Sequence, residues 1–118
     1  MALLADIVIG IVAALHAYFL VLEMFLWDKP FGLRAFGQSL EAAKASKVLA
    51  ANQGLYNGFL AAGLSWGLLL GDNGQDVKLF FLGCALIAGI YGAATASRKI
   101  LFVQAFPAAL GIVLLLLS

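Results

Sequence analysis

The sequence predicts an all-α integral membrane protein, a bundle of four transmembrane helices with a short interfacial amphipathic helix between the first two. Of the 118 residues, 64% are hydrophobic and only 11% are charged, against roughly 25% charged residues in a typical soluble domain. A soluble fold of this length could not bury so much apolar surface, because small domains bury a smaller share of their chain. The length allows a single transmembrane domain, residues 1–118.

Four apolar stretches are each long enough to cross a bilayer, which takes about 20 mostly apolar residues. The predicted helices cover residues 4–27, 48–70, 79–97 and 100–117. The first stretch lacks the positive flank of a signal peptide, so we expect it to be retained as a helix. In lipid a helix satisfies its own backbone hydrogen bonds, which is why continuous apolar runs indicate helices here.

The three connections between these stretches differ in kind. Residues 72–76 read as a tight polar turn, and Arg98-Lys99 barely separates the last two helices. Residues 31–47 are longer and amphipathic, with Pro30 suited to the start of a helix. Their apolar side chains recur at helical spacing, at Leu33, Phe36, Leu40 and Ala43. We therefore expect one short helix lying at the membrane surface.

The positive charges predict the topology. The connections over residues 28–47 and 98–99 lie on the same side of a four-helix bundle, and they hold six of the seven Lys and Arg residues. Only Lys78 falls on the other side. Because positive loops stay in the cytoplasm, the sequence predicts a multi-pass protein of the inner (plasma) membrane with both termini non-cytoplasmic.

Polar side chains gather in the cytoplasmic half of the predicted bundle. A polar group at membrane depth is costly unless it is used or satisfied. The candidates are His16, Glu23, Asn52, Gln53, Tyr56, Asn57, Tyr91, Thr95 and Gln104. All four helices contribute to this set, so we expect one cavity to bring several of these side chains together. Its predicted members are Glu23, Asn52, either Gln53 or Asn57, Tyr91 and Gln104. That cavity should open toward the cytoplasm or sideways to lipid.

His16 and Glu23 are seven residues apart, which places both on one helical face. The functional interpretation of Glu23 is a carboxylate in a polar cavity, able to bind a proton or a cation. The alternative is that Glu23 reaches water or pairs with a lysine of the loop. His16 serves either this site or a structural hydrogen bond between helices.

The run from Asn52 to Asn57 is the most unusual stretch of the second helix. Its amides and Tyr56 can bind a polar ligand or tie helices together. Five glycines of this region have GxxxG spacing, which lets helices approach closely: Gly54, Gly58, Gly63, Gly67 and Gly71. We expect these glycines to serve helix packing.

Several functional classes are not indicated. One histidine and one cysteine, Cys84, are too few for a zinc site, so no metal and no cofactor is expected. A net charge of +1 gives no sign of nucleic acid. The expected partners are the lipid bilayer, a small amphipathic or cationic ligand, and further copies of the chain in a homo-oligomer.

The sequence resembles the small bacterial and fungal membrane proteins catalogued as domain of unknown function 1304. The resemblance covers nearly the whole chain. It rests on His16 and Glu23, on the run from Asn52 to Asn57, and on the stretch from Tyr91-Gly92 to Gln104 and Pro107. It implies a membrane protein and no particular activity.

Three functions fit these observations. A proton- or cation-linked transporter or channel subunit would use Glu23 to bind the ion, and four short helices would need a homo-oligomer to complete a pathway. A membrane enzyme acting on a lipid-soluble substrate would use Glu23 or His16 as general acid or base. The third possibility is a non-catalytic subunit of a larger membrane complex.

Overall fold

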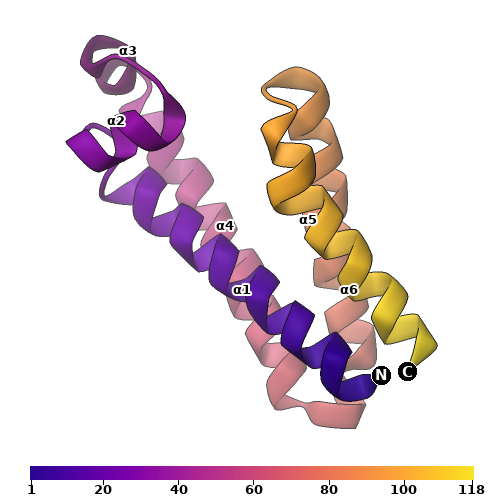
Figure 1. Ribbon diagram of the computed structural model, residues 1–118. Helices are drawn as coiled ribbons and strands as arrows, with labels where there is room; N and C mark the ends of the chain where they lie inside the picture. The colour runs from indigo at the N-terminus through magenta and orange to yellow at the C-terminus, as the bar shows by residue number, and fades with distance from the viewer. The chain divides into compact units, whose positions relative to one another are not determined.

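The computed structural model describes residues 1–118 and contains helices only. In chain order these are α1 (Ala2–Met24), α2 (Pro30–Phe36), α3 (Leu40–Ala45), α4 (Lys47–Leu69), the 3-10 helix η1 (Gly71–Gly74), α5 (Gln75–Thr95), the π-helix η2 (Leu101–Ala105) and α6 (Phe106–Leu117) (Figure 1). The all-α prediction is confirmed. The ends of the long helices differ from the predicted ends by a few residues.

Two helical stretches are long and apolar enough to cross a membrane, Ala2–Met24 and Gly71–Thr95. The stretch Leu101–Leu117 is apolar but shorter. Helix α4 has 23 residues, but the amides of its first half make it less apolar than α1. Length and composition therefore support two membrane spans, and the predicted four-span bundle stays a prediction.

The chain forms two compact units. Unit 1 comprises residues 1–15 and 60–118, and unit 2 comprises residues 16–59. Helices α1 and α4 each contribute one part to each unit.

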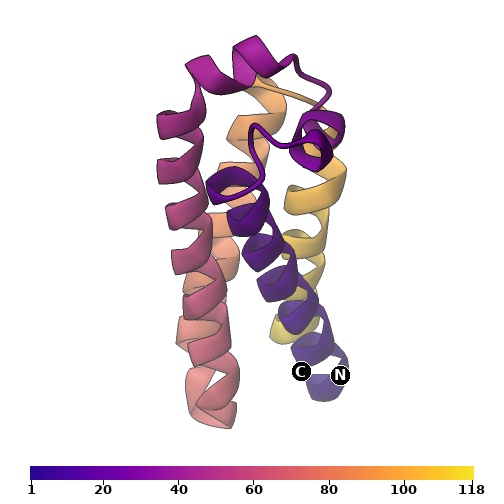
Figure 2. The same cartoon turned by 90° about the vertical axis from the view of Figure 1, so that its left-hand side faces the viewer.

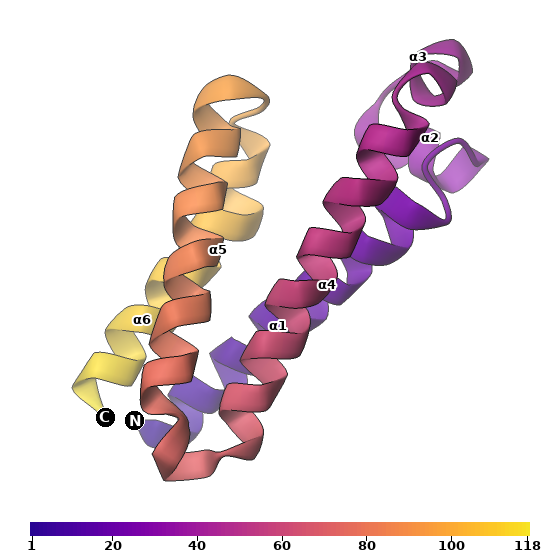
Figure 3. The same ribbon diagram turned by 180° about the vertical axis from the view of Figure 1, so that it is seen from behind.

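Unit 1 is built around an apolar core. Its buried side chains come from α1, α4, α5 and α6: Ala5, Ile9, Val12, Ala13, Leu64, Leu82, Leu114 and Leu115. Helices α5 and α6 run antiparallel as a hairpin, and the two ends of the chain lie side by side in this unit (Figure 3). Where these helices span a membrane, close van der Waals packing of these side chains holds them together, because lipid tails are as apolar as the core itself.

The turn between α4 and α5 differs from the predicted polar turn over residues 72–76. Gln75 and Asp76 already belong to the first turn of α5, and η1 makes the connection. Gly71 has a φ of 61°, and a Cβ there would meet nothing within 4 Å. The expectation that Gly71 packs helices is therefore wrong, because its role is to permit a left-handed backbone.

The helix predicted over residues 100–117 contains a π-helical turn. The Phe106 N–H donates to Leu101 O, five residues back. Pro107 follows directly, and it has no N–H to donate to the carbonyl of Val103 in an α-helical pattern. Pro107 therefore directly follows the turn where the α-helical pattern of hydrogen bonds is interrupted.

In unit 2, the segment predicted as one interfacial helix forms two short helices, α2 and α3 (Figure 2). Gly37 breaks the helix with a left-handed backbone (φ 61°), and its N–H donates to Leu33 O. Ser39 then caps α3, accepting a hydrogen bond from Ala42 N. Helical spacing of the apolar residues continued through this break, so the period alone did not reveal it.

Three side-chain contacts involve the loop that follows α1. Trp27 Nε1 donates to Ser46 Oγ at 3.1 Å, and the Trp27 ring packs on Phe36 with ring centres 4.8 Å apart. Lys47 Nζ donates to Asp28 Oδ2 at 3.0 Å. The loop after α1 therefore contacts α2 through Phe36, and it contacts the junction between α3 and α4 through Ser46 and Lys47.

We expect acid to release the Asp28–Lys47 ion pair. The hydrogen bond from Lys47 lowers the pKa of Asp28 below its ordinary value of 3.8. Its contribution to stability is therefore complete above about pH 5, and it is lost as the pH falls below 3.8 through the lower value of the folded state. Fluorescence of Trp27 in a Trp66→Phe background should change over that range. The Asp28→Asn variant should lack this transition, and an identical transition in it would contradict the assignment.

Candidate functional site

Glu23 is a buried carboxylate at the end of α1. It is 5% exposed, and Asn57 of α4 donates a hydrogen bond from Nδ2 to its Oε1 at 2.5 Å. Both residues belong to unit 2. The sequence predicted this meeting of Glu23 with an amide of the second helix, and the structure assigns it to Asn57.

Glycines allow α1 and α4 to approach closely at this point. A Cβ on Gly54 would lie 2.7 Å from Met24 Cγ and 3.0 Å from Glu23 Cβ, and one on Gly58 would lie 2.6 Å from Leu20 Cδ1. Larger residues would push the two helices apart. The glycines at 54 and 58 therefore set the distance over which Asn57 reaches Glu23.

Glu23 has no basic partner. The structure contains two salt bridges, Lys47 with Asp28 and Lys78 with Asp6. The alternative in which Glu23 pairs with a lysine of the loop is not found, since neither salt bridge includes Glu23. The carboxyl group is held by a neutral amide.

His16 is the second buried polar residue on this face of α1. Its side chain is 1% exposed and contacts Phe19 edge-on, with ring centres 5.5 Å apart. Seven residues of helix separate it from Glu23, or about 10 Å at 1.5 Å per residue. The shared face is thus buried at both positions, although the two groups are too far apart to bond directly.

The other polar residues of α4 do not turn toward Glu23. Asn52 Nδ2 donates to Val48 O at 3.0 Å within its own helix, and Gln53 is exposed. Tyr56 is 65% exposed. Of the amide and tyrosine run, only Asn57 bonds the carboxylate.

Tyr91, Thr95 and Gln104 lie in unit 1 and have local partners there. Tyr91 is 71% exposed, and Thr95 Oγ1 donates to Tyr91 O at 2.7 Å. Gln104 Nε2 donates to Ala85 O at 3.0 Å, which joins η2 to α5. The single cavity shared by all four helices stays a prediction.

The remaining glycines of α4 contact α5 in unit 1. A Cβ on Gly63 would lie 2.5 Å from the Phe81 ring, and one on Gly67 would lie 2.8 Å from Lys78 Cγ. Each glycine makes room for a specific side chain of α5.

Sequence reasoning missed the pairing of Asp6 with Lys78. Lys78 Nζ donates to Asp6 Oδ1 at 3.0 Å and to Gly71 O at 3.4 Å, and Lys78 itself is only 5% exposed. A signal was available, since Asp6 is a charged residue within the first apolar stretch and Lys78 directly precedes the third.

The site around Glu23 can hold a proton or a small cation. No group of three His, Cys, Asp or Glu side chains could hold a metal ion. A carboxylate with an amide neighbour can instead release and rebind a single positive charge. Its burial makes an uncompensated negative charge costly.

Replacing Asn57 by Leu is expected to destabilise the protein by about 1–3 kcal/mol, because Glu23 would be left buried without its donor. Unfolding in detergent, followed by circular dichroism, would measure the loss. The control is Asn52→Leu, whose exposed amide bonds only its own helix, with an expected change within about 0.5 kcal/mol. The double variant Glu23→Leu/Asn57→Leu should recover most of the loss. Strict additivity of the two single changes would contradict the pairing.

Comparison with known proteins identifies the family. Residues 10–116 match the family described as "Protein of unknown function (DUF1304)", and the chain belongs to it. A curated relative, "Uncharacterized protein YpaA" of Lactococcus lactis subsp. lactis (strain IL1403), is 28% identical over 106 residues, which cover 88% of this chain and 89% of the relative. No solved structure matches the chain.

Proposed function

We propose that this member of the DUF1304 family is a four-span membrane protein that acts as a proton- or cation-linked transporter or channel subunit, with Glu23 as the ion-binding group. Helix α1 and the stretch Gly71–Thr95 supply two spans by length and composition. Helix α4, with 23 residues, would extend about 35 Å, which is enough to cross roughly 30 Å of hydrocarbon. The stretch Leu101–Leu117 supplies the fourth span, with local thinning of the bilayer.

The proposed orientation follows the positive-inside rule. The segment over residues 28–47 and the turn at 98–99 face the cytoplasm, and both termini lie on the other side of the plasma (inner) membrane. Two features support this arrangement. The ends of the chain lie side by side (Figure 1), and the only basic residue near them, Lys78, is already neutralised by Asp6.

The observation that supports this function most directly is the burial of Glu23 without a basic partner. It is buried, its neighbour is a neutral amide, and neither salt bridge of the protein involves it. A buried ion pair can serve structure alone, but a buried carboxyl group without a basic partner needs a mobile positive charge whenever it ionises. A proton or a cationic substrate would provide that charge.

A homo-oligomer would complete the pathway. Four short helices enclose little space, and Gln53 and Tyr56 of α4 are exposed in the single chain. In lipid such groups favour partners in a neighbouring helix. We therefore expect α4 to contribute to the interface between copies.

Proton flux in proteoliposomes tests this function. Vesicles loaded with a pH-sensitive dye would receive a valinomycin-driven potential, with Na⁺, K⁺, ethylammonium or tetraphenylphosphonium outside. We expect protein-dependent proton movement, alone or accelerated by one of these cations. Flux equal to that of protein-free vesicles in every case, from a protein that is monomeric in detergent, would overturn the proposal.

A further inference from the structure

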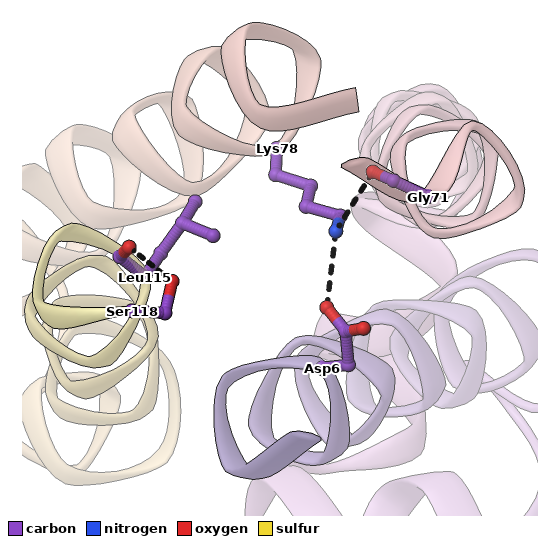
Figure 4. Close-up of polar contacts among 5 residues, drawn as sticks. All are labelled: Asp6, Gly71, Lys78, Leu115 and Ser118. Carbon is purple, nitrogen blue, oxygen red and sulfur yellow. Dashed lines mark hydrogen bonds and ion pairs between the residues drawn. The ribbon is translucent and has the colours of Figure 1, made fainter. Parts of the chain in front are cut away.

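A cavity of about 260 Å³ lies in unit 1, at the end that holds both chain termini. Its lining residues include Asp6, Asp72, Gln75 and Lys78, together with Leu115 of α6 and Ser118. Figure 4 shows Asp6, Lys78, Leu115 and Ser118 in this part of unit 1. All of these residues belong to unit 1, whereas Glu23 and Asn57 belong to unit 2.

Lys78 is the one basic residue of the lining, and it is buried. Its side chain is 6% exposed and spans from α5 to Asp6 of α1 (Figure 4). Its stem lies where Gly67 has no side chain, and a Cβ there would be 2.8 Å from Lys78 Cγ. The chain thus accommodates a long basic side chain at a position where a smaller apolar one would be the simpler solution.

Stability alone does not account for this lysine. Only the lysine of this pair is buried, since the Asp6 side chain is 44% exposed. Taking an ammonium group out of water costs desolvation energy that one ion pair hardly repays, and apolar replacements are often neutral or stabilising. An ammonium group also has three N–H donors. Asp6 Oδ1 and Gly71 O accept two of them, so Lys78 can donate one more hydrogen bond to an acceptor in the cavity.

The cavity also contains a carboxylate that no base neutralises. Asp72 lines the wall, and neither salt bridge of the protein includes it. The lining side chains hold two carboxylates and one ammonium. An ammonium group would be attracted to Asp72, while an anionic oxygen could accept the remaining N–H of Lys78.

We propose that this cavity binds a small zwitterion, with its anionic group at Lys78 and its ammonium group at Asp72. The volume is just below the range of roughly 300–1,000 Å³ that is usual for ligand pockets, so it fits one small molecule or one headgroup. The shared chemistry is that of phosphoethanolamine, which can come from a free metabolite or from a lipid headgroup. This inference does not depend on the function proposed for Glu23.

Binding of phosphoethanolamine, ethanolamine and inorganic phosphate to the detergent-purified full chain tests the proposal by isothermal titration calorimetry. We expect phosphoethanolamine to bind at least tenfold more tightly than either fragment. Asp72→Asn should remove this advantage, and since Asp72 is exposed, this variant should fold normally. Lys78→Met should abolish the binding of phosphate. The control Asp76→Asn changes an exposed carboxylate outside the lining and should bind as the wild type does.

A second experiment distinguishes a free ligand from a lipid headgroup. Native mass spectrometry of protein extracted from vesicles that contain equal parts of phosphatidylethanolamine and phosphatidylglycerol would report a retained lipid. Retention of phosphatidylethanolamine that is lost in Asp72→Asn assigns the site to a headgroup, and calorimetric binding without retention assigns it to a free molecule. The absence of both signals, or signals that Asp72→Asn leaves unchanged, would overturn the proposal.

Discussion

Glu23→Gln is expected to abolish proton-linked flux while leaving the fold intact. The amide keeps the shape of the side chain, and its oxygen can still accept the hydrogen bond that Asn57 Nδ2 donates to Glu23 Oε1. What it loses is the ability to release and rebind a positive charge. Flux in proteoliposomes should therefore drop to the level of protein-free vesicles, whereas circular dichroism and thermal unfolding should match the wild type.

Two further variants make this result specific. Glu41→Gln changes an exposed carboxylate on α3 and should transport as the wild type does. Glu23→Asp keeps the ionisable group but draws it back by one methylene from Asn57, so partial flux is expected. Full flux in Glu23→Gln would contradict an ion-carrying role for Glu23, and the carboxyl group would then serve only to bond α1 to α4.

The sequence predicted the buried face of α1 because helical periodicity relates positions on one helix. A spacing of seven places His16 and Glu23 on the same side, and both are buried. Periodicity does not say which neighbour such a face meets. For this reason the choice among Asn52, Gln53 and Asn57 could be made only with α4 packed against α1.

Tyr56 and Tyr91 illustrate the same limit. The sequence predicts Tyr91 in the polar cavity, and Tyr56 as a residue that binds a ligand or ties helices together. In the structure Tyr56 is 65% exposed and Tyr91 is 71% exposed. Tyrosine is amphipathic and is stable both in a cavity and at an outer surface near the interface. Residue type therefore did not determine the side to which these rings point.

The pairing of Asp6 with Lys78 could not be predicted from local sequence patterns, for a different reason. Its two members are 72 residues apart, and no spacing rule connects residues at that distance. Each charge was visible as an exception beside an apolar run, but their pairing depends on the packing of α1 against α5 in unit 1. The break at Gly37 is the opposite case, since a local glycine signal was present and the apolar period masked it.

Because α5 contacts η2, replacing either of two glycines of α5 by alanine should change the free energy of unfolding in opposite directions. A Cβ on Gly89 would lie 2.8 Å from Ala105 N and 3.0 Å from Ala105 Cα, whereas a Cβ on Gly83 would meet nothing within 4 Å. Backbone atoms cannot move aside as a flexible side chain can, so Gly89→Ala must displace the π-helical turn and strain the bond from Gln104 to Ala85.

We expect Gly89→Ala to lower the free energy of unfolding by about 1–3 kcal/mol, the usual cost of overpacking. Gly83→Ala should instead raise it by up to about 1 kcal/mol, because alanine favours the helix more than glycine does. Unfolding of both variants in mixed detergent micelles, followed by circular dichroism, measures the difference. Both variants lie on α5 and make the same chemical change, so only the proximity of Ala105 separates them. Equal shifts of the same sign would show that α5 and η2 do not approach this closely.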